Sequence, residues 1–493
     1  MGAVMLNLFQ HLLVSLRLTM LPVRTQLGII SLLRDILMSE SVAKKASALE
    51  IIKTLRGSGF TALIVGGAVR DMVMGIEPKD YDIVTDASPE QVEQLFDTVY
   101  PVGSQFGVSL VVMNNDAFEV ACFRKDGVYE DGRRPSSVKP GDEIADAGRR
   151  DFTINALFYD PIEERVIDHV GGIRDIHDRI IRAVGDPRVR MYEDRLRMLR
   201  AVRFAARFMF AIDPATEMAV RENAHAVLDV SAERIGEELV KIFGGHNSGY
   251  AFTLLDRTGL LSVILPEVSA LKGIEQPPEY HPEGDVFEHT RSMLEMYDGG
   301  SVTLALGILF HDIAKPVTIT RTDRIRFNRH DDIGAGMAGA ILRRLRVRNE
   351  ISERVRALVR NHMNFINVRN MRRSTLRRFI AQEGFHEMLE LYRLDCLASH
   401  GDLEDYDYLV KIVGEEIHKN SNLKLPAPLL TGDDLIMLGY EEGPLIGTIL
   451  REIEDSHFEG ALETREEAIN FVRQRFPLQI PRQNRRRRSS QPD

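Results

Sequence analysis

The stretch Leu63–Asp82, LIVGGAVRDMVMGIEPKDYD, places an apolar run directly before a Gly-Gly pair and ends in two closely spaced aspartates. The run Leu63–Val65 predicts a short buried strand. Gly66 and Gly67 would let the backbone approach a phosphate closely, because neither residue carries a Cβ atom. A helix that begins near Ala68 would point its N–H groups at the same anion. The stretch therefore has the elements of a phosphate-binding turn between a strand and a helix.

Three charged side chains in this stretch extend the interpretation from phosphate binding to metal-assisted chemistry. Arg70 offers a planar guanidinium that can donate two hydrogen bonds to a phosphate. Asp80 and Asp82, if both lie on a strand, point to the same face because side chains alternate along a strand. Two carboxylates on one face suit Mg²⁺ carrying a triphosphate. In this order the stretch resembles the nucleotidyltransferase superfamily, specifically the class II tRNA nucleotidyltransferases (CCA-adding enzymes) and the related bacterial poly(A) polymerases.

The resemblance implies roles for three further residues. Glu119, in the predicted strand FEVACFR, matches the position of a third acidic residue near the metals, although an ordinary exposed strand glutamate reads the same way. The segment RRDFTINA over residues 149–156 resembles the family's ribose-binding motif. By that resemblance Arg150 contacts phosphate and Asp151 the ribose hydroxyls, while Gly67 and Arg70 complete the nucleotide-binding set. The run Tyr129–Pro135 resembles the loop that moves when the enzyme switches between nucleotides.

A second motif, EDRLRMLRAVRFAAR over residues 193–207, resembles the family's base-reading motif. On a helix, residues spaced by three or four line one face, so we expect one stripe to carry the charged residues Asp194, Arg197, Arg200 and Arg203. By the resemblance, an Asp and an Arg here read the pairing edge of the incoming base in place of a template. The segment Ser231–Leu239 resembles the motif that supports this helix. Without the resemblance, the stripe would be a solvated helix face.

The C-terminal half carries a third pattern of histidines and aspartates, which resembles an HD domain, the metal-dependent phosphohydrolase fold. Imidazole and carboxylate together suit a divalent metal that activates water. Such a domain could hydrolyse phosphoesters or serve only as a helical RNA-binding body. Its candidate ligands are His289, His311, Asp312, His330, His362 and Asp395.

The predicted fold is α+β, a polymerase-β-like nucleotidyltransferase sheet followed by a mostly helical body that includes the HD domain. Strands are expected at Ala62–Val65, Tyr81–Val84, Val108–Met113 and Phe118–Phe123, because short apolar runs are bounded there by turn residues. Helices are expected at Ala46–Ser58, Val69–Met74 and Pro89–Phe96. The expected divisions are an N-terminal extension (1–41), the head (42–187), a base-recognition or RNA-binding region (188–275), the HD domain (276–423), a C-terminal helical region (424–480) and a basic tail (481–493).

The function that the resemblance implies is template-independent addition of C and A from CTP and ATP to the 3′ end of tRNA, with Mg²⁺ at Asp80 and Asp82 and release of pyrophosphate. Poly(A) addition is the alternative, together with addition of only CC or only A. The stretch Val102–Val108 lacks the basic pair that marks some poly(A) polymerases, which favours CCA addition. An HD phosphohydrolase whose head merely binds RNA is the alternative from another class.

The composition bears on the number of domains, the location and the kind of RNA binding, but it does not choose between these functions. The 493 residues exceed a single compact core and suggest several domains. Two cysteines give no disulfide framework, which favours a reducing, cytoplasmic location. The formal net charge of −10 speaks against a protein that coats nucleic acid, but local basic patches can still bind RNA. The first 37 residues contain no acidic residue before Asp35, so an organellar transit segment is the alternative to a start at Met38. No stable membrane association is expected.

Overall fold

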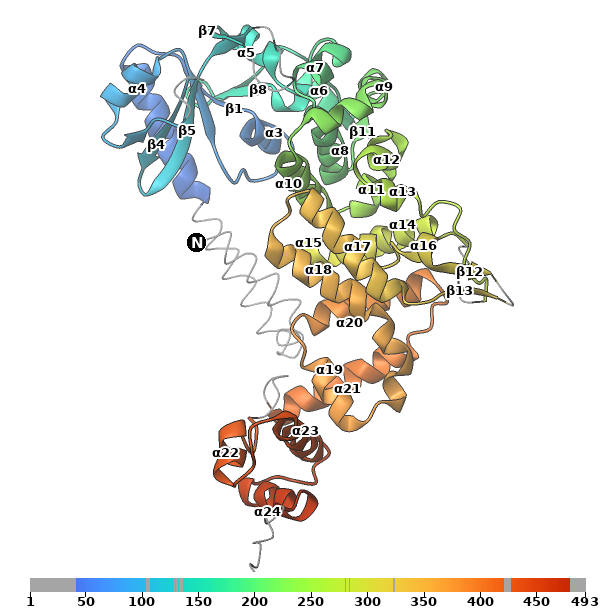
Figure 1. Cartoon of the computed structure of the whole chain (residues 1–493). Helices are drawn as coiled ribbons and strands as arrows, with labels where there is room; N and C mark the ends of the chain where they lie inside the picture. The colour runs from blue at the N-terminus through green and yellow to red at the C-terminus, as the bar shows by residue number, and fades with distance from the viewer. Residues whose placement is uncertain are drawn as a thin grey trace, which may run out of the picture. The chain divides into compact units, whose positions relative to one another are not determined.

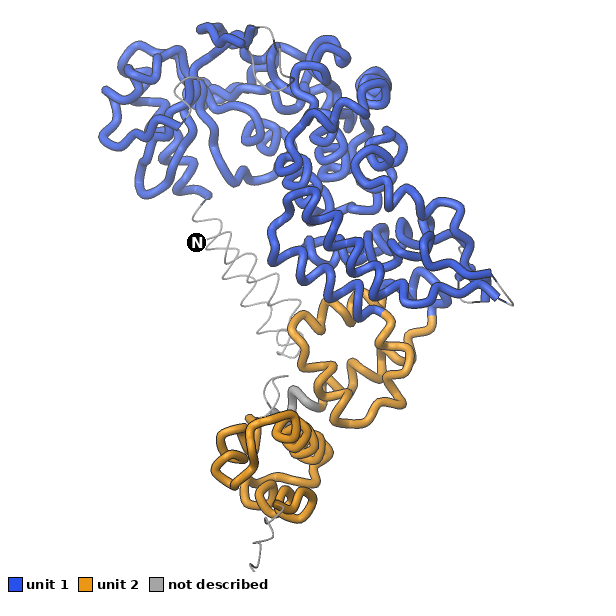
Figure 2. The backbone as a smooth tube through the Cα atoms, in the orientation of Figure 1, with its two compact units in different colours: residues 1–362, 394–401 blue, residues 363–393, 402–493 orange. Residues whose placement is uncertain are grey.

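The structure is a computed structural model that describes residues 41–102, 107–127, 129, 132, 136–279, 281–282, 284–321, 324–420 and 427–478 (Figure 1). The chain divides into two compact units (Figure 2), residues 1–362 with 394–401 and residues 363–393 with 402–493. The predicted basic tail and all but Ser41 of the predicted extension lie outside the described residues. No helix among those residues is long and apolar enough to cross a membrane.

The head is built on a mixed sheet of seven strands in the order β3-β4-β5-β2-β1-β8-β9. A described helical segment over 41–57 precedes it. The elements of the head are β1 (Ala62–Val65), α3 (Gly67–Val73), β2 (Asp82–Thr85), α4 (Pro89–Leu95), β3 (Val99–Tyr100), β4 (Val108–Met113), β5 (Asp116–Cys122), β6 (Arg124–Asp126), β7 (Val138–Pro140), α5 (Glu143–Arg149), η2 (Thr153–Asn155), β8 (Leu157–Asp160), β9 (Arg165–Asp168), α6 (Gly172–His177) and β10 (Ile180–Ile181).

The four strands predicted from apolar runs all exist, and two of them, β1 and β4, have the predicted bounds. β1 pairs antiparallel with β2, which places Val65 opposite Asp82. β2 runs parallel to β5, with Ile83 opposite Val120. Between the sheet and its flanking helices lies a buried cluster that includes Leu63, Val84 and Phe158. The sheet thus brings the ends of β1, β2 and β5 to one region.

Helices follow the head within unit 1, as the sequence predicts. The first group comprises α7 (Pro187–Glu193), α8 (Arg197–Phe208), the short strand β11 (Ala211–Ile212), α9 (Pro214–Asn223), η3 (Ala224–Asp229), α10 (Ala232–Phe243), α11 (Ser248–Arg257), α12 (Leu260–Ile264) and α13 (Pro266–Ser269). The second group comprises α14 (Val286–Met296), α15 (Val302–Phe310), α16 (Lys315–Thr318), the hairpin β12 (Ile319–Arg321) and β13 (Ile325–Phe327), α17 (His330–Arg344) and α18 (Asn349–Asn361). α17 packs along α18, and α18 along α15.

Unit 2 is helical in its described part. Its elements are η4 (His362–Asn370), α19 (Arg373–Ile380), α20 (Phe385–Ala398), α21 (Glu404–Asn420), α22 (Gly432–Met437), α23 (Pro444–Phe458) and α24 (Arg465–Arg475), where η4 starts and α20 ends on unit 1 residues. A separate buried cluster that includes Leu435, Ile449 and Val472 holds α22, α23 and α24 together. The domain boundaries predicted from the sequence do not coincide with this division and stay predictions.

Candidate active site

Two carboxylates lie side by side on the head sheet. Asp82 is the first residue of β2 and Glu119 lies on β5, and the parallel register places both one residue before the pair Ile83 and Val120. Asp80 lies outside the strand, two residues before it, so the strand alternation expected for Asp80 and Asp82 does not apply. Asp80 is nevertheless near enough for its charge to act on Asp82.

The electrostatics of these carboxylates fit a divalent cation. Partial removal from water raises the pKa of Asp82 to about 6, and the charges of Glu119 and Asp80 add to the shift while that of Arg150 opposes it. Lys44, from the helical segment over 41–57, lies 3.0 Å from Asp80 through its ammonium nitrogen. Carboxylate oxygens held together against their own repulsion are the hard ligands that Mg²⁺ prefers. Asp80, Asp82 and Glu119 would hold such an ion.

The turn between β1 and α3 leaves room for a guanidinium beside the carboxylates. Gly66 has a φ of 75°, which favours glycine, and a Cβ atom there would lie 3.3 Å from Nη1 of Arg150. Arg150 is held from behind by Asp146, which accepts hydrogen bonds from Nε at 3.0 Å and from Nη2 at 2.8 Å. Nη1 therefore faces the glycine turn. This placement suits the predicted phosphate contact of Arg150, and Gly67 begins the adjoining helix.

Arg70 lies differently from its predicted role as a phosphate donor. Its side chain is buried, and Asp71 accepts hydrogen bonds from its Nε at 2.8 Å and Nη2 at 2.6 Å. Nη1 donates to the side-chain oxygen of Asn155 at 2.6 Å. The guanidinium also stacks over Phe208, 4.7 Å from the ring centre. In this conformation Arg70 joins parts of the protein, and a phosphate contact would require it to move.

Asp151 is likewise engaged by the protein and not open to solvent. Its Oδ1 accepts from the backbone N–H of Phe152 at 2.8 Å and from Asn155 at 3.1 Å, and its Oδ2 accepts from Nε and Nη2 of Arg200 at 2.8 and 2.5 Å. Although burial alone would raise it, the charge of Arg200 and these hydrogen bonds lower the pKa of Asp151. The ribose contact predicted for Asp151 stays a prediction, one that would compete with these bonds.

The predicted stripe of four charged residues on one helix is only partly formed. Asp194 lies outside helix α8 in an extended conformation, where it caps the end of α7 and lies 3.5 Å from Arg234. Arg197 is buried, and its Nη1 and Nη2 donate to Glu193 and to the carbonyl oxygen of Arg149. The predicted helix is therefore broken at Asp194, between α7, which ends at Glu193, and α8, which begins at Arg197.

The other two arginines of the predicted stripe, Arg200 and Arg203, lie on α8 with partly exposed side chains. Arg200 keeps about a third of its side chain exposed while bound to Asp151. Arg203 donates to Glu238 of α10 at 3.0 Å. Together with the pair Arg234 and Asp194, this contact fits the supporting role predicted for Ser231–Leu239. The predicted moving loop lies outside the described residues except for Tyr129 and Gly132, whose carbonyl oxygen accepts from the N–H of Arg195 at 3.3 Å.

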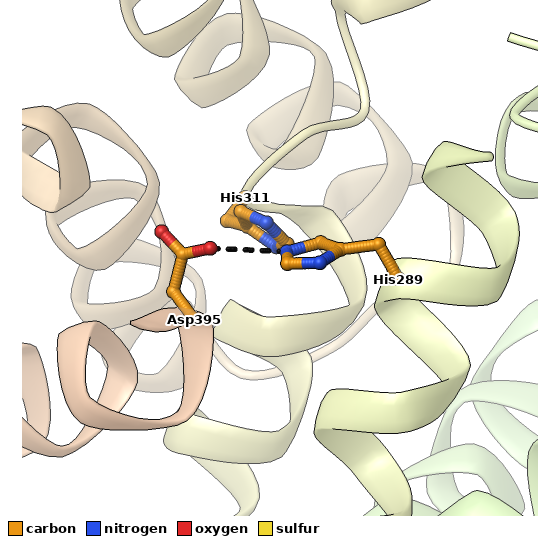
Figure 3. Close-up of side chains that lie close together, drawn as sticks. All are labelled: His289, His311 and Asp395. Atoms are coloured by element: carbon orange, nitrogen blue, oxygen red, sulfur yellow. Dashed lines mark ion pairs between the residues drawn. The ribbon is translucent and has the colours of Figure 1, made fainter. Parts of the chain in front are cut away.

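The six HD residues come together within unit 1, as predicted. They form two groups, one of His289, His311 and Asp395 and one of Asp312, His330 and His362, and within each group the potential ligand atoms lie within 4.8 Å of one another. Figure 3 shows the first group, in which Nε2 of His289 lies 3.0 Å from Oδ1 of Asp395. Nε2 of His311 lies 3.1 Å from Oδ2 of Asp312, which connects the groups.

The backbone prepares three of these histidines for metal binding. Nδ1 of His311, His330 and His362 lies 2.7–2.8 Å from the carbonyl oxygen of the third residue before each. A ring that donates from Nδ1 presents the lone pair of Nε2, the arrangement found at metal-ligating histidines. Nε2 of His330 and Nε2 of His362 nevertheless lie 3.1 Å apart. Two lone pairs at this distance require a shared proton or cation, so the donor set fits a divalent metal.

Burial and nearby charges shift the pKa values of two of these ligands, His362 and Asp312. Removal from water and the nearby His311 lower the pKa of His362 to about 4, which keeps the ring neutral and able to ligate. Burial alone would raise the pKa of Asp312, but the charges of His311 and Lys315 hold it well below the usual value. Nζ of Lys315 lies 2.6 Å from Oδ2 of Asp312 and also donates to Gln276.

The sequence reasoning missed several residues that the structure places at these sites: Lys44, Asn155, Gln276 and Lys315. Lys315 follows Asp312 by three residues at the turn between α15 and α16, and Asn155 follows Asp151 by four, so spacing could have indicated both contacts. Lys44 and Gln276 give no such signal, because their partners lie 36 and 39 residues away in the sequence. Several arginines of the helical regions are paired with acids, as Arg344 is with Glu267, Arg369 with Asp405 and Arg378 with Glu454.

Comparison with known families finds three matches along the chain. The Poly A polymerase head domain matches residues 62–182, a family described as the probable RNA and SrmB-binding site of polymerase A matches residues 209–272, and the HD domain matches residues 284–389. The first two lie within the predicted head and base-recognition regions, although the motif over residues 193–207 falls between them, and the third covers five of the six HD residues. The resemblances to the poly(A) polymerase family and to the HD domain are thereby confirmed, and the roles of single residues stay predictions.

Curated relatives and solved structures agree with these matches. The chain is 43% identical over 214 residues to the CCA-adding enzyme of Bacillus licheniformis and 45% identical over 214 residues to that of Geobacillus stearothermophilus. The aligned part spans 43% of this chain and about half the length of each relative (54% and 53%). The Bacillus stearothermophilus CCA-adding enzyme in complex with CTP is 27% identical with a TM-score of 0.62, over 87% of this chain and 98% of that one. The Thermotoga maritima enzyme complexed with tRNA shares the fold, at 20% identity and a TM-score of 0.57, over 87% and 94% of the two chains.

Proposed function

We propose that this chain, which matches the poly(A) polymerase head, RNA-binding and HD families in turn, adds C and A from CTP and ATP to the 3′ end of tRNA. The observation that carries the proposal is the grouping of Asp80, Asp82 and Glu119 beside Arg150 and the Gly66 turn. Carboxylates for a cation and a guanidinium for phosphate are what transfer of a nucleotidyl group requires. The relatives named for CCA addition support the choice over poly(A) addition, and CC-only or A-only addition remains the narrower alternative.

The residues divide the reaction between them. Arg150, held by Asp146, binds the triphosphate where Gly66 leaves space. Asp80, Asp82 and Glu119 would hold Mg²⁺, which when bound would help to activate the 3′-hydroxyl and neutralise the leaving pyrophosphate. The 3′-hydroxyl loses its proton to solvent as its oxygen attacks the α-phosphorus of the nucleotide, and the bond to pyrophosphate breaks. Above its pKa of about 6, the carboxyl group of Asp82 is mostly deprotonated and can bind the cation.

Base choice falls to the segment after α7. Asp194 accepts from an exocyclic amine and Arg197, Arg200 or Arg203 donates to the ring edge, which selects C and A because both carry an amine on that edge. Arg200 is the best placed of the three, since part of its side chain stays exposed. Arg197 would have to release Glu193 or the carbonyl of Arg149 to reach a base. We place this activity in the cytoplasm, on the low cysteine content alone.

A second function is favoured by the histidine groups of the HD region. His330 and His362 have their Nδ1 atoms at backbone carbonyls and their Nε2 atoms 3.1 Å apart, and with Asp312 they would hold one divalent metal. His311 would hold a second with His289 and Asp395. We propose that this site hydrolyses a phosphoester, with the bound metal supplying an activated water. Asp312, Asp395 and the histidines would ligate, and Lys315 would hold Asp312 in place.

One experiment separates the two functions. The double substitution Asp80→Ala and Asp82→Ala should abolish incorporation of labelled CTP and ATP into RNA, while hydrolysis of bis(p-nitrophenyl) phosphate persists. Asp97→Ala, which removes another exposed carboxylate of the head, is the matched control. If incorporation survives the double substitution, the transferase proposal is wrong. If wild-type protein loaded with divalent metal hydrolyses no phosphoester, the second function is wrong.

A further inference from the structure

A buried chain of side chains joins the phosphate-binding side of the head to helix α8. It runs from Asp71 to Arg70, from Arg70 to Asn155, from Asn155 to Asp151 and from Asp151 to Arg200. This series of side chains begins on α3, passes through η2 and ends on α8. Its members alternate between acceptor and donor, so each link satisfies the next.

Asp151 is saturated within this chain. Its two oxygens accept four hydrogen bonds, two from Arg200, one from Asn155 and one from the backbone of Phe152. A carboxylate has about four acceptor positions, so none is left over for a ligand. Asp151 therefore acts in this conformation as the anchor of Arg200.

Asn155 is the one uncharged member in the middle of the chain. Its carbonyl oxygen accepts from Nη1 of Arg70 at 2.6 Å, and its amide nitrogen donates to Oδ1 of Asp151 at 3.1 Å. The amide can accept from the cation on one side with its oxygen and donate to the anion on the other with its nitrogen. Its side chain is buried, so water cannot readily replace either bond.

Both ends of the chain hold α8. Arg70 stacks on Phe208, and Asp71 lies 3.6 Å from Arg207. Arg200, about two turns earlier on the same helix, is held by Asp151. On the other side, α3 follows β1 directly, and Val65 of β1 pairs with Asp82. This series of hydrogen-bonded side chains thus connects the paired strands β1 and β2, the second of which carries Asp82, with α8, which carries the base-reading arginines.

We propose that Asn155 is a positioning residue for nucleotidyl transfer, which fixes α8 relative to the catalytic carboxylates without touching the nucleotide. The inference rests on the proposed function of the head. Loss of Asn155 would leave the nucleotide's own contacts in place but let α8 shift against β2. A misplacement of about 1 Å can lower the rate of a reaction about 100-fold. The effect should therefore fall on kcat and not on KM.

The test compares Asn155→Ala and the milder Asn155→Ser with Thr216→Val. Thr216 is also buried in unit 1 and makes hydrogen bonds to Asp213 and Ala183, but it lies outside the chain. We expect kcat for CTP incorporation to fall about 10- to 100-fold in Asn155→Ala and less in Asn155→Ser, with KM within about threefold of wild type. Thr216→Val should lower the thermal midpoint but leave both constants near wild type.

Hydrogen exchange gives a readout that does not depend on activity. Amides of α8 should exchange several-fold faster in both Asn155 variants than in wild type and Thr216→Val. Unchanged exchange in α8 would overturn the proposal even if activity fell. A rise in KM with kcat unchanged would also overturn it, because Asn155 would then bind the nucleotide directly. An inactive wild-type protein would instead contradict the proposed function, and the exchange measurement would still decide the role of Asn155.

Discussion

Asp82 and Glu119 lie side by side on the parallel strands β2 and β5, and their proximity, with partial removal from water, raises the pKa of Asp82 to about 6. The fold thus holds like charges together at the cost of its own stability, which a bound cation would offset. This relationship is why we assign the chemistry of the head to this edge of the sheet.

The raised pKa predicts a pH-dependent gain from Asp82→Asn. Because the folded pKa lies above the ordinary carboxyl value of 3.8, the contribution of Asp82 to stability is fully present below pH 3.8 and is lost as the pH rises through about 6. We therefore expect the substitution to raise the thermal midpoint of the metal-free protein at pH 8 and to change it little at pH 4. Thermal melts in EDTA at both pH values make the measurement. An equal shift at both pH values would contradict the prediction.

Lys44 competes with a cation for Asp80, since its ammonium lies 3.0 Å from that carboxylate. Lys44→Met should lower the Mg²⁺ concentration needed for half-maximal incorporation. Both side chains are partly exposed, so the gain should stay below about fivefold, as for surface ion pairs. Lys45→Met, at the exposed neighbouring position, is the control and should leave the Mg²⁺ titration unchanged. A higher Mg²⁺ requirement in Lys44→Met would mean that Lys44 assists the site.

The pair Asp151 and Arg200 should show the cost of an unpaired buried charge. Arg200→Met leaves Asp151 buried beside Asn155 without its main cation, and we expect the amides of α8 to lose about 2–3 kcal/mol of protection. Native-state hydrogen exchange measures this loss. Adding Asp151→Asn should restore part of the protection, because the uncompensated charge is then gone. No recovery in the double variant would show that Arg200 stabilises α8 through other contacts.

Substitution of two histidines in the HD region should lower the metal content of the protein without lowering nucleotide incorporation by the head. Because Nε2 of His330 and Nε2 of His362 face each other at 3.1 Å, we expect one or more divalent ions to bind there. Elemental analysis should find metal in wild-type protein and less in a variant with His330→Ala and His362→Ala. Nucleotide incorporation by that variant should stay near wild type. Equal metal content in the two proteins would remove these histidines from the ligand set.

Much of the head could be predicted from the sequence because its signals are local. The apolar runs at β1 and β4 give those strands their observed bounds, and the helix expected at Pro89–Phe96 differs from α4 by one residue. β8 and β9 were not predicted, although β8 pairs with β1 across more than ninety residues of sequence. Their existence depends on that distant pairing, which apolar periodicity does not reveal.

The partners that the candidate site residues have in the structure could not be predicted from their residue types. Arg70 and Asp151 have the chemistry of nucleotide ligands, but burial directs their bonds to Asp71, Asn155 and Arg200. Spacing by three placed Asp194 on a helix, whereas the chain leaves α7 there in an extended conformation. Side-chain spacing predicts a shared face only within an unbroken helix, and the break is not visible from residue types alone.

The central claim, addition of CCA to tRNA, is tested most directly by the length of the product. Purified protein is incubated with tRNA that lacks its 3′ CCA, with labelled CTP, labelled ATP or both, and the products are sized at nucleotide resolution. The account predicts a defined extension that ends after C, C and A when both nucleotides are present, and only the C residues with CTP alone. A long ladder from ATP alone, or no incorporation under any condition, would contradict it.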